Sequence, residues 1–495
     1  MLPERNESCR MQITTIKCRI AVSYPGRKIY NRKTLRGFDM KLFQPVDMTK
    51  DDPVKSIMIF TIPMLIGNVA QQLYNTVDSI IVGRFVGDNA LAAVGSAGPI
   101  LNLMLVLFMG IATGAGIMVA QYYGAQLRKE LSKTIGTCIT LTLIASLFIM
   151  IVGPLITRPL LHLLNTPESI LDWCYNYLFI IFLGISGGGL YNILSGVLRG
   201  LGDSVSALIY LLVATFLNII LDYVFVANFG LGVAGVALAT ILAQFVSAAL
   251  CVWKLTRMQE IFDLKKEYLV PKKKYTSKLI RLGLPSGVTQ AIFSMSMIVV
   301  QSLTNSFGEL FIAANVIVMR IDGFVMLPAF SFGSAMTTYA GQNIGAGKMD
   351  RVIEGARKGT LAAMSISAVL TALIILFGRN LMSIFTETQE LIDLSYRMMR
   401  ILAPGYIVME VTQCLSGIMR GAGDTVTPMW ISILSSVLLR IPLAYGLVAL
   451  SKTPSLPQGN CAMMFISMLI SWSCGALMTF VMYRRGKWKS KAIVA

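Results

Sequence analysis

Charged side chains are scarce in this chain of 495 residues: Asp, Glu, Lys and Arg together make up 14%, against about 25% in soluble domains. There is one histidine, His162, and the eight cysteines are scattered without a Cys-x-x-Cys pair. These absences exclude a metal site or proton relay built on histidines, and they argue against a zinc site or a redox pair. The low charge also excludes a soluble enzyme and a disordered chain.

Energy-coupling and export signals are missing as well. The stretch nearest to a phosphate-binding P-loop, GQNIGAGKM at 341–349, has the wrong spacing and ends in Met, where the motif needs Ser or Thr. No nucleophile–base constellation stands out. We therefore expect neither an enzyme nor a nucleotide-driven pump. The first 50 residues contain no apolar core followed by a cleavage site, so a signal peptide is not supported.

Apolar residues dominate what remains. They make up 55% of the chain, and the mean hydropathy is +0.68. Because a spanning helix needs about 20 residues, the composition suits an all-α integral membrane protein. Its stretches are too long and continuous for an outer-membrane barrel. The pattern predicts twelve transmembrane helices at 56–83, 90–122, 132–157, 173–198, 205–228, 231–255, 277–306, 310–341, 355–377, 392–418, 426–449 and 461–483.

The surplus of positive charge, +18 overall, is unevenly distributed among the connections. Lys and Arg concentrate in one alternate set of loops and in both terminal segments. The positive-inside rule therefore predicts a multi-pass protein of the cell membrane with both termini cytoplasmic, and no nucleic-acid partner. The basic segment 255–276 is predicted to be a cytoplasmic linker, or alternatively an amphipathic helix on anionic membrane lipid.

An internal repeat organises the chain. Residues 194–204 read LSGVLRGLGDS and residues 415–425 read LSGIMRGAGDT, an offset of 221 that also maps AQYYGA at 120–125 onto GQNIGA at 341–346. Six helices per half predict two pseudo-symmetric six-helix bundles in a parallel repeat. The expected domains are a basic disordered cytoplasmic tail (1–50), an N-terminal lobe (51–254), the linker (255–276), a C-terminal lobe (277–484) and a cytoplasmic tail (485–495).

The repeated R-G-x-G-D-[ST] motif is typical of a turn between helices. Its glycines suit helix termination, and Asp203 and Asp424, or the Ser or Thr that follows each, can cap the next helix. The alternative is a gating role for Arg199 and Arg420.

Ionisable residues at membrane depth are expensive and therefore functional candidates. The first half has two such acids, Asp78 and Asp222, and no Lys or Arg within its helix cores. Asn218 lies one turn before Asp222, so the two share a helix face. Two acids without a basic partner favour a bound cation or a shared proton. The alternative is that each acid only hydrogen-bonds across helices.

The second half holds two positive and two negative candidates: Arg320, Asp322, Glu410 and Arg440. We expect them to form a charge-neutral buried network that fixes helix packing. The alternative is that Glu410 or Asp322 titrates during transport.

Several stretches together resemble the multidrug and toxic compound extrusion (MATE) family. They are YNTVDSIIVGRFVG at 74–87, AQYYGA at 120–125, LNIILDYVF at 217–225 and the paired R-G-x-G-D motifs. The resemblance covers about residues 50–485 and looks closest to the DinF-like branch. It implies a twelve-helix secondary exporter with two lobes that exchanges Na⁺ or H⁺ for organic, often cationic, compounds.

The same resemblance implies a coupling site. That branch has an acid in the first helix, an Asn and an Asp in the fifth and a Thr in the sixth, matched here by Asp78, Asn218, Asp222 and Thr240, with Gln71 and Tyr74 as supporting residues. Such oxygen ligands suit Na⁺, and these four residues would be its ligands. The second-lobe acid of the other branch has no match in the seventh helix, SGVTQAIFSMSMIVV.

The sequence thus predicts an ion-coupled (Na⁺ or H⁺) antiporter that exports organic, cationic drugs or metabolites by alternating access. The alternatives are a lipid-linked sugar flippase and a passive channel. We expect no cofactor other than Na⁺, a small organic substrate, contact with membrane lipid, a monomer and a bacterial source.

Overall fold

The computed structural model describes residues 45–164 and 166–494 of the chain. The chain divides into two units, Met1–Leu42 and Phe43–Ala495, and the following concerns the second unit. Most of the predicted tail, 1–50, lies outside the described residues. Its last part is ordered: Met48 is fully buried, because its backbone is hydrogen-bonded to Gln342 and Asn343.

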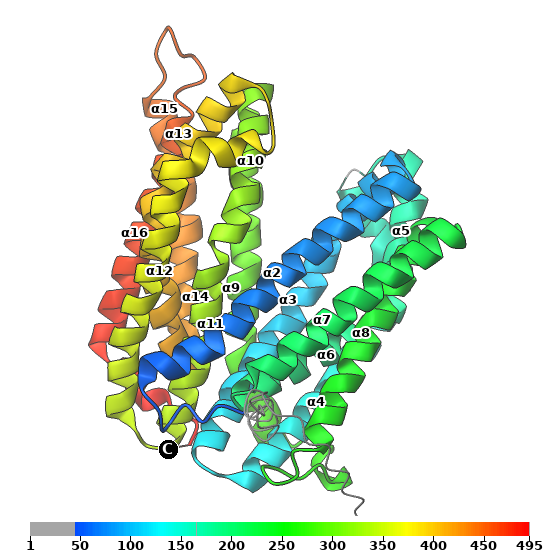
Figure 1. The fold of residues 1–495 in the computed structure, drawn as a ribbon, viewed down its shortest axis with the longest axis vertical. Coiled ribbons are helices and arrows are strands. Elements are labelled where there is room, and N and C mark those ends of the chain that lie inside the picture. Colours follow the sequence, from blue (N-terminus) through cyan, green and yellow to red (C-terminus); the bar gives the residue numbers. More distant parts are fainter. Residues whose placement is uncertain (1–44, 165, 495) are drawn as a thin grey trace, which may run out of the picture. The chain divides into compact units, whose positions relative to one another are not determined.

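The described residues form helices joined by short turns (Figure 1). Eleven are long and apolar enough to cross a membrane, and a pair bent by 55° at Gly184 forms a twelfth span. The predicted twelve-span all-α fold is confirmed; its helices extend a few residues beyond the apolar runs. The elements are α2 (Pro53–Phe85), α3 (Asp88–Gly124), α4 (Arg128–Leu163), α5 (Glu168–Leu183), α6 (Ile185–Gly200), α7 (Ser204–Asp222), η1 (Tyr223–Asn228), α8 (Gly232–Thr256), η2 (Lys266–Tyr268), α9 (Lys273–Asn305), α10 (Glu309–Val325), α11 (Leu327–Gly345), α12 (Met349–Ser383), α13 (Gln389–Gly421), α14 (Val426–Ile433), η3 (Leu434–Leu439), α15 (Arg440–Leu450), α16 (Ala462–Arg485) and η4 (Lys487–Lys491).

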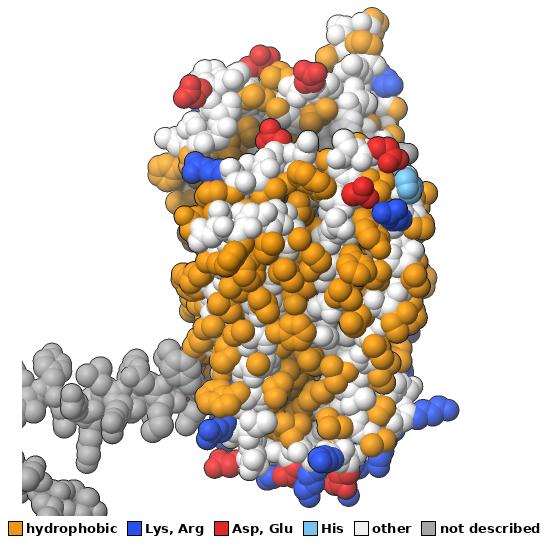
Figure 2. All heavy atoms as spheres, turned by 90° about the vertical axis from the view of Figure 1, so that its right-hand side faces the viewer, with side chains coloured by type: hydrophobic (Ala, Val, Ile, Leu, Met, Phe, Trp, Pro, Cys, Tyr) orange, Lys and Arg blue, Asp and Glu red, His pale blue; other side chains and the backbone are white. Residues whose placement is uncertain are grey.

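The surface carries the pattern expected of a membrane protein. Figure 2 shows a face whose middle is dominated by hydrophobic side chains, with Lys, Arg, Asp and Glu gathered toward the two ends. Large apolar residues such as Leu155 and Leu376 are each 73% exposed. An exposed apolar surface of this extent is stable in contact with lipid and unfavourable in contact with water.

Two bundles follow from the repeat, α2–α8 and α9–α16, and the first helix of each crosses into the other. Ile57 and Phe60 near the start of α2 pack with Met336 of the second bundle, whereas Ile81 near its end packs in the first. In α9, Leu279 packs in the first bundle and Leu303 in the second. Figure 1 shows α2 running from one bundle to the other. Each crossing helix contains an internal proline, Pro63 or Pro285, which removes a backbone hydrogen bond and permits a bend.

Glycines bring the bundles into backbone contact at one end of the unit. We call this the basal end; it contains the turns 125–127, 201–203, 346–348 and 422–425. A Cβ added at Gly110 would lie 2.7 Å from the Gly283 carbonyl oxygen, and one added at Gly114 would lie 2.9 Å from the Gly283 nitrogen. These contacts join the basal halves of α3 and α9.

Two buried glutamines, one from each repeat, cross the same interface; we call Gln121 and Gln342 the glutamine pair. The Gln121 amide donates to the Gly421 carbonyl at 2.8 Å and accepts from the Ile493 backbone N–H at 2.7 Å. The Gln342 amide donates to the Gly200 carbonyl at 3.0 Å and accepts from the Met48 backbone N–H at 3.1 Å. Each bundle therefore holds the R-G-x-G-D turn of the other, together with a terminal segment.

The linker packs on the first bundle instead of lying free. Phe262 is 1% exposed, and Arg128 forms an ion pair with Asp263 at 2.9 Å. The hydrogen bond from Arg128 lowers the pKa of Asp263. The segment holds one short 3₁₀ turn, Lys266–Tyr268, so the alternative of an amphipathic surface helix does not match the described residues. The segment 485–495 also packs, up to its last described residue: Trp488 is buried against Tyr483.

The capping role expected of the repeated motif is present in both copies. Asp203 accepts from the Ser206 backbone N–H at 2.9 Å, and Asp424 accepts from the Thr427 backbone N–H at 3.2 Å. Each carboxylate also accepts from the hydroxyl of the same residue, at 2.7 Å in both copies. The motif therefore sets the turn into α7 and into α14.

Candidate functional site

An acid pair lies inside the first bundle. Asp78 lies on α2 and Asp222 is the last residue of α7. The two carboxyls are close enough to interact electrostatically, and Asp222 is fully buried. Two carboxylates that close repel unless a proton or a cation lies between them.

Asn218 and Thr240 complete the oxygen cluster. With its amide oriented to satisfy its neighbours, Asn218 donates to Asp222 Oδ2 at 2.8 Å and accepts from the Thr240 backbone N–H at 3.2 Å. The i, i+4 spacing in α7 puts both polar groups on one face, as the sequence predicts. The structure therefore brings Asp78, Asn218, Asp222 and Thr240 together.

The two supporting residues differ in position. The Tyr74 hydroxyl lies 3.5 Å from Thr240 Oγ1 and so borders the cluster. The Gln71 amide instead faces Asn75 Oδ1, also at 3.5 Å, and lies at the edge of the cluster. Tyr177 of α5 is a neighbour that the sequence reasoning missed: it is 5% exposed and close enough to interact electrostatically with both acids.

A π-helix follows Asp222 directly in the chain. The π-helix η1 runs from Tyr223 to Asn228, and such insertions are frequent at functional sites. Asp78 Oδ1 and Asp222 Oδ1 have no hydrogen-bond partner. Over the described ranges, neither acid forms an ion pair with Lys or Arg. The cluster therefore has carboxyl oxygens that are available to bind a proton or an Na⁺ ion. Groups of three or more His, Cys, Asp or Glu that could hold a metal do not occur in the described part of the chain.

In the second bundle, the four predicted charges do not form one network. Arg320 is exposed. Glu410 is 1% exposed and its Oε2 has no partner. Asp322 accepts a short hydrogen bond from Tyr406, and among the described residues it forms no ion pair within 4.0 Å of Arg440. The prediction of a single network fails because residue type and membrane depth do not specify which way each side chain points around its helix.

Replacing Glu410 by Gln is expected to slow export less than tenfold, because Gln keeps the buried volume and Glu410 has no cationic partner to lose. Export rate and thermal unfolding should be measured for E410Q beside E354Q, which changes an exposed Glu of α12. A loss of export as deep as that of an Asp78 variant would instead assign Glu410 a titrating role.

A polytopic helical protein built from two repeated bundles, with an acid pair between two helices of one of them, has the architecture of a secondary membrane transporter. The MatE family model matches residues 63–224 and 285–446. The chain therefore belongs to the MatE family.

Relatives agree with that assignment, and a solved structure agrees with the fold. The chain is 30% identical over 448 residues to the "Probable multidrug resistance protein YoeA" of Bacillus subtilis, covering 89% of this chain and 95% of the relative. It is 25% identical to the "Probable multidrug resistance protein NorM" of Thermotoga maritima, covering 89% and 94%. A structure described as the "Outward-facing conformation of a multidrug resistance MATE family transporter of the MOP superfamily" superposes with a TM-score of 0.83 at 24% identity, covering 90% and 98%; this likeness concerns the fold.

Proposed function

We propose that this MatE-family transporter is an antiporter that exports organic, cationic compounds in exchange for Na⁺ or H⁺. The observation that carries the proposal is the electrostatic interaction between Asp78 and Asp222. One oxygen of each acid has no hydrogen-bond partner, and among the described residues neither acid forms an ion pair with Lys or Arg. A site of this kind is stable when a cation or a proton is bound and strained by repulsion when it is empty. Binding and release can therefore bias the bundles between two states.

The proposed cycle alternates access between the two ends of the unit. In this state the glutamine pair and the glycine contacts hold the basal end closed. We assign the basal end to the cytoplasm because the basic loops lie there. The described state is then the outward-facing one, in which the acid pair exchanges its ion with the outside.

The two other functions have less support. A flippase for a diphosphate-linked lipid would need several cationic side chains around a central cavity. In the part of the chain that the structure describes, neither acid of the pair forms an ion pair with Lys or Arg. A passive channel would need no acid pair between α2, which crosses from one bundle to the other, and α7.

Transport by the purified protein tests the proposal. In proteoliposomes, ethidium should accumulate inside against its own gradient when Na⁺ or H⁺ is more concentrated inside the liposome than outside. The ion whose gradient drives this accumulation is the coupling ion. Equilibration without accumulation under either gradient would contradict antiport.

Orientation is tested by labelling single cysteines introduced into a cysteine-free variant. A cysteine at Ser455 should react with an impermeant maleimide in intact cells. A cysteine at Lys273 should react only after permeabilisation, because its loop is basic and lies at the basal end. Labelling of the Lys273 position from outside would reverse the assignment.

A further inference from the structure

A cavity lies inside the second bundle, and neither acid of the pair lines it. Its empty space is about 380 Å³, a volume that includes open solvent at its mouth, and the part that water-sized molecules can enter is about 30 Å³. Helices α9, α10, α13, α15 and α16 contribute its lining. Eight of the thirteen lining residues are apolar, and four of these are methionines: Met297, Met319, Met464 and Met468.

One wall holds an arginine that lacks a proper hydrogen-bond acceptor. Arg440 is 2% exposed, and its Nε has no partner. Within the described residues, its guanidinium donates only to the Met297 sulfur, at 3.7 Å, and sulfur is a weak acceptor. A buried guanidinium in this condition is costly unless an anion can satisfy it.

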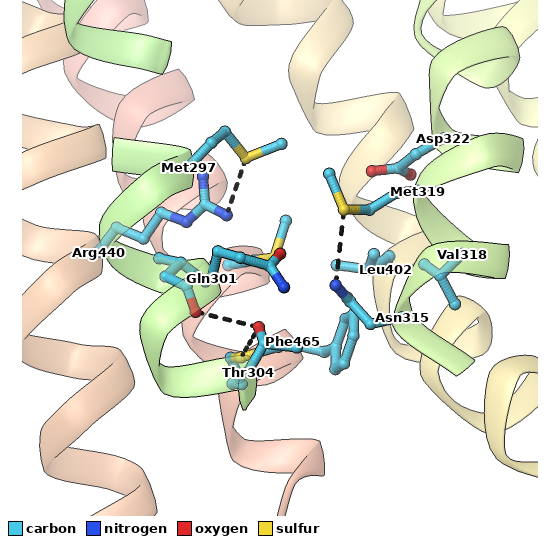
Figure 3. A pocket seen from close by; sticks show the side chains of 13 residues that line it. Met297, Gln301, Thr304, Asn315, Val318, Met319, Asp322, Leu402, Arg440 and Phe465 are labelled. Atoms are coloured by element: carbon cyan, nitrogen blue, oxygen red, sulfur yellow. Dashed lines mark hydrogen bonds between the residues drawn. The ribbon is translucent and has the colours of Figure 1, made fainter. Parts of the chain in front are cut away.

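The opposite wall holds a carboxylate. Figure 3 shows Arg440 and Asp322 on opposite sides of the cavity, with Gln301 and the thioethers of Met297 and Met319 between them. Asp322 is held by the Tyr406 hydroxyl. The two charges are more than 4.0 Å apart, so they offset each other at long range and do not fill each other's hydrogen-bonding positions.

We propose that this cavity binds a small zwitterion with an apolar body, whose carboxylate pairs with Arg440 and whose ammonium group pairs with Asp322. The Arg440 guanidinium and the Asp322 carboxylate then both gain a partner of opposite charge, and no net charge is added inside the bundle. The planar fork of Arg440 suits a carboxylate, which it can contact through two parallel N–H groups. The methionines accept an aromatic body of variable shape.

This inference rests on the proposed function only in treating the occupant as a transported compound; the binding itself is independent of coupling. It differs from the cationic substrates proposed above because an isolated cation leaves Arg440 unpaired. An isolated anion likewise leaves Asp322 without its partner.

Binding of four related indoles to the full-length protein in nanodiscs tests the proposal. Tritiated tryptophan carries both charges. Tryptamine and tryptophan methyl ester carry the amine alone, and indole-3-propionate carries the carboxylate alone. Tryptophan should bind at least tenfold more tightly than each of the other three. Equal affinities of tryptophan and tryptamine, or no saturable binding of tryptophan at millimolar concentration, would overturn the proposal.

Variants then assign the two groups. R440M should reduce tryptophan binding to the level of tryptamine and leave tryptamine unchanged, and D322N should do the same relative to indole-3-propionate. R320M, which removes an exposed arginine of the same helix as Asp322, should change nothing. If R440M weakens tryptamine and tryptophan equally, Arg440 only supports packing and the proposal is wrong.

Folding and coupling are checked separately. If R440M does not yield a monodisperse protein, R440K should retain a reduced preference for tryptophan, because Lys keeps the charge and loses the fork; an unchanged preference would contradict the arginine contact. Ethidium export under an ion gradient, measured on the wild type, reports on the proposed function alone. Its failure would leave the indole series fully interpretable.

Discussion

Replacing either acid of the first bundle, as D78N or D222N, is expected to reduce gradient-driven export at least 100-fold while the protein still folds and inserts. Asn keeps the size of Asp, so packing is preserved. It cannot take up a proton or carry the charge that attracts Na⁺. The ion then no longer distinguishes between the two states, and a ligand shifts a conformational equilibrium only by its differential affinity.

Export should be measured in proteoliposomes with imposed gradients, beside D172N as a matched control. Asp172 is an exposed acid of α5 whose ion pair with Arg158 is on the surface, so its loss should have little effect. Equilibrium exchange of substrate without a gradient should persist in D78N if the substrate site is intact. If D78N exports at the rate of the wild type, coupling at this pair is disproved, and Asp322 and Glu410 become the residues to test.

Much of this site could be predicted from the sequence. Asp78 and Asp222 stand out because charge is rare at membrane depth, and helical periodicity places Asn218 beside Asp222. Thr240 came from the family resemblance, since nothing in its local sequence indicates that its backbone N–H meets Asn218. Tyr177 carries no signal of its own: it is a buried aromatic residue in an apolar helix, like many others.

Side-chain direction explains the predictions that failed. Glu410 and Arg440 are buried in the second bundle, but Glu410 Oε2 has no hydrogen-bond partner and Arg320 is exposed. Helical periodicity relates residues on one helix and says little about which helices adjoin them. The crossing of α2 and α9 between bundles was likewise outside the reach of hydropathy, because hydropathy shows how apolar a helix is and not which bundle each half of it contacts.

The glutamine pair was visible in the sequence as a repeat and not as a function. Gln121 and Gln342 share the offset of 221 that relates the two halves. A polar side chain repeated at the same place near the ends of two apolar helices is costly unless it is paired. That argument could have marked both residues as contacts, although only the structure supplies Gly421 and Gly200 as their acceptors.

Replacing both glutamines by methionine, as Q121M/Q342M, is expected to shift the protein strongly toward a state with an open basal end. Methionine keeps the volume but removes four hydrogen bonds. The Gly200 and Gly421 carbonyls and the Met48 and Ile493 N–H groups then remain buried and unpaired. Each such group costs about 1–3 kcal/mol, and a population shift from 1:99 to 99:1 needs about 5.5 kcal/mol. In the open state water satisfies all four groups, so the cost falls on the closed state alone.

Distances between spin labels on the basal ends of α4 and α12 report the shift, measured by pulsed electron resonance in nanodiscs. The double variant should populate a longer distance, each single variant should move part of the way, and export should fall because return to the outward-facing state is slow. Q259M is the matched control, since Gln259 is exposed in the linker at the same end. An unchanged distance distribution in a folded double variant would show that the glycine contacts between α3 and α9 hold the basal end closed without the glutamine pair.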